Sequence, residues 1–254
     1  MRLAKHIVLG IFIIVFVHIM IDNYVNISEI KKKENIDYLR VGYVNLNKSK
    51  VSKADLTKIE HYACDIWLFA EWNGDNFELY ESFSNPYTNS YELTDSFTYG
   101  FHVLTKDSIE AREFDSNKRP YACDYSKVMI NNDSLTIALI HAPPPVPTCK
   151  FETRKYLSDL MDNMGEENKN VLIVGDFNIL PFQDSYKKII DSGFSDLFEN
   201  SLFGANTYGV KSYLPKMIRV DYMFYRGSLS VKYAERFKLD NSDHYGLIAD
   251  YMLK

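Results

Sequence analysis

The sequence predicts an α/β fold built on buried strands. Its clearest element is 171–174, four consecutive aliphatic residues with polar residues before them and Gly175 after them. A short apolar run with such boundaries is typical of a strand that is buried on both faces. The run 65–70 has the same character. Just before 65–70, the segment 52–63 has apolar residues at helical spacing after Ser52, a favourable N-cap, so buried strands are combined with amphipathic helices.

The other elements follow from the same patterns. Alternation of apolar residues predicts a strand at 38–44, and the polar turn 131–133 predicts a hairpin between 128–130 and 134–140. We expect further strands at 77–83, 97–104, 220–225 and 246–251, further helices at 152–163 and 183–192, and a loop at 84–95. With 254 residues, the chain has ample length to bury a core.

Composition excludes little but sets limits. The net charge of −5 gives no global basic field, which counts against a protein that coats nucleic acid by charge alone. It does not exclude an enzyme that neutralises phosphate locally with a metal. The three cysteines have no metal-site spacing and form no disulfide framework. One pair, for which Cys123 and Cys149 are a guess, can bridge if the domain lies outside the cytoplasm.

The N-terminal segment 1–22 is predicted to be a membrane anchor or signal segment. Arg2 and Lys5 give it a positive start, and 7–21 is almost wholly apolar. That length is short of the roughly 20 residues of a full span and fits a signal segment, but no small-residue cleavage site follows. We therefore favour an uncleaved anchor with the body outside the cytoplasm, on the periplasmic or extracellular side. The first alternative is that the segment is cleaved and the domain is secreted. The second is that the segment is a buried helix of the core.

A polar linker is predicted at 23–37, and a single domain at 38–254. The run of lysines at 31–33 opposes the favoured orientation of the anchor under the positive-inside rule. Its simpler interpretation is a solvated part of the linker. The sequence says nothing firm about oligomers, and no protein partner is predicted.

Polar side chains gather at the ends of the predicted strands. Taken singly, each has a purely structural explanation. A histidine after a strand is usually a structural hydrogen-bonding group, and a Glu at the end of a strand is usually solvated. An Asp inside a strand is rarer because it needs a buried partner. Six predicted strands carry such polar residues, and purely structural roles do not explain why all six do so. The residues are Asn45, Glu71, His141, Asp176 with Asn178, Asp221, and Asp243 with His244.

This set of side chains predicts a metal-assisted phosphoester hydrolase. Carboxylates with an asparagine form the oxygen-rich site that Mg²⁺, Mn²⁺ or Ca²⁺ prefers, and two histidines are few for zinc. Two histidines with acidic neighbours suit general acid–base chemistry and stabilisation of a phosphorane-like transition state. Together they describe hydrolysis of a phosphate ester assisted by a divalent cation.

Several motifs carry a family resemblance. They are LRVGYVN at 39–45, DIWLFAE at 65–71, HAPPP at 141–145, GDFN at 175–178, RVDYMF at 219–224 and SDHY at 242–245. In their order and spacing, the chain from about 39 to 251 resembles the endonuclease/exonuclease/phosphatase superfamily, which includes deoxyribonuclease I. The resemblance implies a four-layer α/β/β/α sandwich of two mainly antiparallel sheets flanked by helices, with the site where strand ends converge. The compact body is most similar to small bacterial membrane-anchored members.

The resemblance also implies a role for each residue. Glu71, with Asn45 and Asp243, would hold the metal. Asp176 would position or deprotonate the attacking water, and Asn178 would hold a phosphate oxygen. His244, oriented by Asp221, would act as base or electrostatic stabiliser, and His141 would protonate the leaving group or bind phosphate.

Three functions remain open from the sequence. The first is a phosphodiesterase or nuclease acting on DNA or RNA. The second is a sphingomyelinase-like hydrolase of phospholipid headgroups, which the anchor favours, or a phosphomonoesterase. The third is a degenerate scaffold or binding module, against which the intact set of site residues argues. Ala70, Trp72, His102 and Lys106 depart from the family pattern, and we expect the last two to be surface residues.

Overall fold

The computed structural model describes residues 10, 13, 17, 38–72, 87, 89–93, 100–106, 110–113, 126–131, 135–144, 154, 155, 157, 158, 160, 161, 170–199, 206–209 and 218–253. Most of the predicted anchor and the whole of the predicted linker lie outside these residues. Within the described part of the chain, no helix has both the length and the apolar character needed to cross a membrane. The anchor, the linker and the domain boundaries stay predictions.

The described strands form two six-stranded sheets. The first has the order β11-β12-β1-β2-β4-β3, and the second has the order β5-β6-β7-β8-β10-β9. The first sheet has β1 (Leu39–Asn45), β2 (Ile66–Trp72), β3 (Asn89–Leu93), β4 (Gly100–Thr105), β11 (Leu229–Lys238) and β12 (Tyr245–Leu253). The second sheet has β5 (Glu110–Glu113), β6 (Ser126–Asn131), β7 (Thr136–His141), β8 (Val171–Asp176), β9 (Ser195–Asp196) and β10 (Asp221–Arg226).

Each sheet has one parallel pair at its centre, and the other pairings are antiparallel. β1 pairs in parallel with β2, and β7 pairs in parallel with β8. Because the carboxyl ends of parallel neighbours lie at the same sheet edge, Asn45 and Glu71 end up together, as do His141 and Asp176. The antiparallel neighbours β10 and β12 begin at that edge, where Asp221 and His244 lie.

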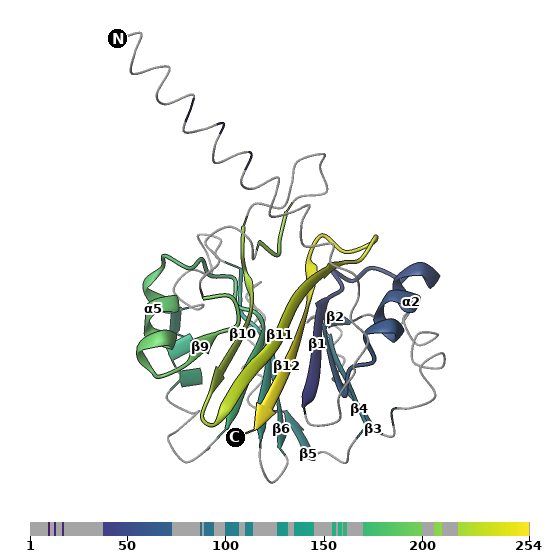
Figure 1. The fold of residues 1–254 in the computed structure, drawn as a ribbon, viewed down its shortest axis with the longest axis horizontal. Helices are drawn as coiled ribbons and strands as arrows, with labels where there is room; N and C mark the ends of the chain where they lie inside the picture. The colour runs from purple at the N-terminus through teal and green to yellow at the C-terminus, as the bar shows by residue number, and fades with distance from the viewer. Residues whose placement is uncertain are drawn as a thin grey trace, which may run out of the picture.

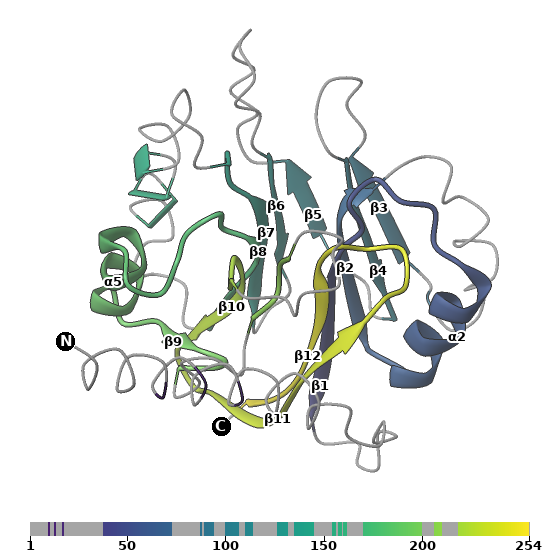
Figure 2. The same cartoon turned by 90° about the horizontal axis from the view of Figure 1, so that it is seen from above.

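Two sheets packed face to face bury the main core between them. Val41, Tyr43 and Leu68 of the first sheet meet Leu139 and Val174 of the second in this inner cluster. Helices cover the outer faces: α2 (Lys53–Tyr62) packs on the first sheet, and α5 (Asp184–Asp191) packs on the second beside residues near 157–161. Figures 1 and 2 show α2 and α5 on opposite sides of the pair of sheets. The predicted four-layer sandwich is confirmed.

Individual elements agree with most of the sequence predictions. Ser52 caps α2 by accepting a hydrogen bond from the amide of Asp55, as its position predicts. The predicted loop 84–95 is wrong in part, because it contains β3. The strands β5, β9 and β11 were not predicted. The predicted strand at 77–83 lies outside the described residues.

The cysteine prediction is tested only in part. Cys64 is free and buried in the core between α2 and the first sheet. Burial raises the pKa of its thiol well above the ordinary value, which suits an inert core residue. Cys123 and Cys149 lie outside the described residues.

Candidate active site

The predicted site residues converge at one edge of the sandwich. Asn45, His141 and Asp176 are the last residues of β1, β7 and β8, and Asp221 is the first residue of β10. Asp176 is the register partner of both His141 and Asp221 on the neighbouring strands. The two sheets therefore bring polar side chains from distant parts of the sequence to one place.

A cavity of about 390 Å³ opens over this edge. Six of the eight predicted site residues line it directly, together with a more apolar wall. The lining residues are Asn47, Glu71, His141, Pro144, Asp176, Asn178, Leu180, Gln183, Tyr208, Ile218, Val220, Asp243 and His244. Asn45 and Asp221 lie behind the lining, where both are completely buried.

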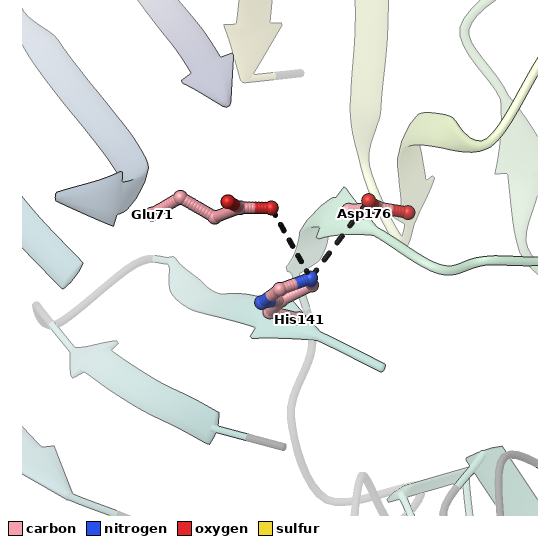
Figure 3. Close-up of side chains that lie close together, drawn as sticks. All are labelled: Glu71, His141 and Asp176. Carbon is pink, nitrogen blue, oxygen red and sulfur yellow. Dashed lines mark ion pairs between the residues drawn. The ribbon is translucent and has the colours of Figure 1, made fainter. Parts of the chain in front are cut away.

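Glu71, His141 and Asp176 form the first cluster. Figure 3 shows both carboxyl groups pointing toward the ring of His141. The Nε2 atom of His141 lies 3.7 Å from Oε1 of Glu71 and 3.9 Å from Oδ2 of Asp176. Asn45 holds the two carboxylates from the other side, because its Nδ2 donates to Glu71 at 3.1 Å and to Asp176 at 3.5 Å.

The backbone at Glu71 is unusual and places its side chain. Glu71 has a positive φ of 52°, and the pairing of β2 with β4 shifts register between Ala70 and Trp72. A bulge of this kind turns one side chain out of the alternating pattern, and such bulges often lie next to active sites. Trp72, which follows Glu71 and departs from the family pattern, packs its ring against that of His102, with ring centroids 4.1 Å apart.

Asp221 and His244 form the second cluster. Oδ2 of Asp221 lies 2.7 Å from Nδ1 of His244, which leaves Nε2 of the ring toward the cavity side. The carboxylate fixes the orientation of the imidazole and favours its charged form. Burial lowers the pKa of His244, but the adjacent Asp221 and the charges of Asp176 and Asp243 raise it further, to about 9.

The other titratable groups are shifted mainly by burial. Burial, with the positive charge of His244, lowers the pKa of His141 to about 4, so its imidazole is neutral at physiological pH. Burial and the neighbouring Asp221 raise the pKa of Asp176 well above its ordinary value. Burial also raises the pKa of Glu71, against the hydrogen bond from Asn45. A cation bound beside crowded, buried carboxyl groups favours their charged form.

Asn178 and Gly175 explain the chain path at the end of β8 and in the loop after it. Asn178 has a positive φ of 51°, its amide donates to Oδ1 of Asp176, and its Nδ2 donates to the carbonyl of Ala142. Gly175 has a φ of 149°, and a Cβ there would overlap the backbone carbonyl of Ile140. Glycine is therefore required for β8 to lie against β7 while Asp176 points into the site.

The donor set fits a hard divalent cation. Ligand atoms of Glu71, His141 and Asp176 lie within 4.8 Å of one another, and so do those of Asp176, Asp221 and His244. Oδ1 of Asp243 is buried and has no hydrogen-bond partner among the described residues. Carboxylate oxygens gathered in one place suit Mg²⁺, Mn²⁺ or Ca²⁺. Asn45 turns its Nδ2 toward Glu71, since its Oδ1 accepts from the amide of Asn47. Its direct contact with metal stays a prediction.

Sequence reasoning gave no role to the hydroxyl residues that hold the site in place. Oγ1 of Thr207 accepts hydrogen bonds from the backbone amides of Val220 and Asp221, and the hydroxyl of Tyr43 donates a hydrogen bond to Oδ1 of Asp221. Ser242 links the carbonyl of Asn45 to the amide of His244. Their hydroxyls join segments far apart in the sequence, so no local pattern shows which group each hydroxyl contacts. His102, expected at the surface, is buried.

Two six-stranded sheets with acidic and imidazole groups at one shared edge define a deoxyribonuclease I-like hydrolase. The family model of the endonuclease/exonuclease/phosphatase family matches residues 42–244. The chain therefore belongs to this family, and it is a metal-dependent hydrolase of phosphoric esters. The match covers every predicted site residue: Asn45 lies near its start, and His244 is its last residue.

Solved structures share the fold at low sequence identity. The chain is similar to D. rerio TDP2 complexed with single strand DNA product (TM-score 0.68, 15% identity, covering 85% of this chain and 99% of that one). It is similar to an endonuclease/exonuclease/phosphatase from Beutenbergia cavernae (TM-score 0.67, 16% identity, covering 86% of this chain and 72% of that one). It is also similar to the human Nocturnin catalytic domain with bound sulfate anion (TM-score 0.62, 16% identity, covering 87% of this chain and 96% of that one). A comparison with curated proteins finds no match.

Proposed function

We propose that this chain is a phosphodiesterase that cleaves nucleic acid. One observation carries the proposal: Glu71, His141 and Asp176, from three strands, and His244, directly before β12, converge on one cavity. Water, a phosphate group and a cation can meet there. The presence of a single strand DNA product in the D. rerio TDP2 structure supports nucleic acid as the substrate of this related fold.

Glu71 and Asp243 are proposed to hold the cation, with Asn45 orienting Glu71. Both carboxyl groups line the cavity, and the buried Oδ1 of Asp243 accepts no hydrogen bond from the described residues, with Nε2 of His244 3.9 Å away. A bound Mg²⁺ or Mn²⁺ would neutralise the negative charge of the phosphate oxygens. The choice between Mg²⁺, Mn²⁺ and Ca²⁺ is left to experiment.

The remaining residues are proposed to move the proton and stabilise charge. Asp176 accepts a proton from the attacking water as the new oxygen–phosphorus bond forms and the bond to the leaving oxygen breaks. Its raised pKa makes it a stronger base than an ordinary carboxylate. His244, with a pKa of about 9, is a cation near neutral pH and stabilises the transition state. His141 is neutral and donates an N–H to phosphate, and Asn178 lies beside it in the cavity lining.

A substrate panel tests this function. The full chain is assayed with bis-p-nitrophenyl phosphate, plasmid DNA and sphingomyelin vesicles, in Mg²⁺ or Mn²⁺ and with EDTA. We expect cleavage of DNA and of the small diester that EDTA abolishes and added Mg²⁺ restores. A Glu71→Gln variant, which keeps the shape but loses a charge, is expected to need more metal for half-maximal rate. Turnover that EDTA leaves unchanged would contradict the proposal.

A second candidate function is hydrolysis of lipid headgroups, and the rim of the cavity favours it. Pro144, Leu180, Ile218 and Val220 form an apolar wall beside the acidic floor. At its edge, the side chain of Ile218 is 40% exposed, and Phe182, in the turn that follows Leu180, is 74% exposed. Apolar side chains exposed around a site suit contact with a lipid surface.

Substitution of this rim separates the two substrates. Phe182→Ser and Ile218→Ser remove apolar area that would be buried in a membrane, and each is expected to lower vesicle hydrolysis by about 10-fold. Turnover of bis-p-nitrophenyl phosphate should not change, and Phe182→Leu should retain vesicle hydrolysis. If the serine variants lose DNA cleavage instead, Phe182 contacts nucleic acid and the lipid candidate is rejected.

We also propose that residues 1–22 anchor the enzyme to a membrane, with the domain on the outer side. The apolar run 7–21 and its basic start support this localisation. Fractionation of cells that express the chain, followed by protease treatment of intact cells or spheroplasts, tests it.

A further inference from the structure

Tyr43 connects the two sheets at the centre of the site. It lies two residues before Asn45, so both side chains point from the same face of β1 toward the second sheet. Asn45 reaches Asp176, and the hydroxyl of Tyr43 donates to Oδ1 of Asp221 at 3.0 Å. Asp176 and Asp221 are themselves register partners on β8 and β10. One strand of the first sheet therefore holds two adjacent carboxylates of the second.

The hydrogen bonds around Asp221 leave its carboxylate one orientation. Oδ1 accepts from Tyr43, Oδ2 pairs with His244, and the backbone amide donates to Thr207. Tyr43 and Asp221 are both completely buried, so water does not replace the phenol as donor. Burial and the adjacent carboxylates raise the pKa of Tyr43 well above its ordinary value, so the phenol keeps its proton and acts as a donor.

We propose that Tyr43 is a positioning residue that fixes the Asp221 carboxylate and, through it, the ring of His244. The proposal rests on the proposed function for its kinetic consequence, but the hydrogen bond itself is a property of the folded chain. Without the phenol donor, Oδ1 of Asp221 is a buried acceptor with no partner, and the carboxylate is free to rotate away from His244. The imidazole then no longer has one fixed direction toward the phosphate.

Tyr43→Phe tests this role because it removes one oxygen and keeps the ring that packs in the core. We expect kcat for bis-p-nitrophenyl phosphate to fall by about 10-fold, the lower end of what the loss of an orienting partner costs, with KM unchanged. In an Asp221→Asn background the same substitution should cause no further loss, because the group that it positions is already altered. Equal losses in both backgrounds would overturn the proposal.

Tyr251→Phe is the matched control. Tyr251 is also buried in the inner cluster, on β12, and its hydroxyl faces the Sδ atom of Met223 at 3.8 Å. Its removal should leave kcat unchanged. A loss of activity in Tyr251→Phe as large as in Tyr43→Phe would show a general effect of core polarity, which contradicts a positioning role.

A spectroscopic measurement separates this proposal from the proposed function. The Nδ1 proton of His244, held by Asp221, is expected to give a downfield proton NMR signal, assigned by its loss in His244→Gln. Tyr43→Phe should shift or broaden this signal, and Tyr251→Phe should not. An unchanged signal in Tyr43→Phe overturns the proposal even if the enzyme is active. A shifted signal supports it even if none of the tested substrates is cleaved.

Discussion

Asp176→Ala is expected to lower phosphodiester hydrolysis by at least about 100-fold, the scale of losing a general base. Asp176 lies on the cavity wall between His141 and Asp221, and burial raises its pKa. No other described carboxylate occupies both clusters of candidate metal ligands. Its loss therefore removes the proton acceptor and weakens the cation site together.

The measurement is kcat/KM for bis-p-nitrophenyl phosphate over a range of Mg²⁺ concentrations. Asp176→Asn keeps the size of the side chain and should lose as much activity as the alanine variant, because the amide cannot accept the proton of water. Asp191→Ala, an exposed carboxylate at the end of α5, is the matched control and should behave like the unaltered chain. Full activity in Asp176→Ala would reject the mechanism.

The central strands were predictable because their sequences are locally unambiguous. Residues 171–174 are aliphatic throughout, and every residue of β8 is buried. In contrast, β11 contains Glu235 and Arg236, which are buried although charged. Glu235 accepts a hydrogen bond from Tyr62 on α2, and Arg236 donates to the carbonyl of Asn206. Because these partners are distant in the sequence, the pattern of β11 looks solvent-exposed until the fold is known.

The candidate site shows the same division. Glu71, Asp176 and His244 follow or precede strong strand signals, so their meeting at one sheet edge could be expected from the sequence. The supporting hydroxyls could not, because the hydrogen bond between Tyr43 and Asp221 joins residues 178 positions apart. The bulge at Glu71 was also hidden, since a positive φ at a glutamate has no signal in a sequence of strand-forming residues.

His244→Ala is expected to lower hydrolysis by at least about 100-fold, because it removes the charged group that faces the phosphate. His244 borders the cavity, and its Nδ1 is held by Asp221 at 2.7 Å. The assay is again kcat/KM for the small diester in saturating Mg²⁺. His61→Ala, an exposed histidine in the last turn of α2, is the control and should keep full activity. Activity retained in His244→Ala would exclude His244 from the chemistry.

The pairing of His244 also predicts how the stability of the metal-free chain depends on pH. Its pKa rises from an ordinary 6.5 to about 9 in the folded state, despite burial, because Asp221 favours the charged ring. The folded chain thus binds this proton more tightly than the unfolded chain, and the stabilisation is complete below pH 6.5 and lost as pH rises through 9. Urea unfolding in EDTA should show the free energy of unfolding of the unaltered chain approaching that of His244→Gln across this range. A difference between the two proteins that grows with pH would mean that Asp221 does not stabilise a charged His244.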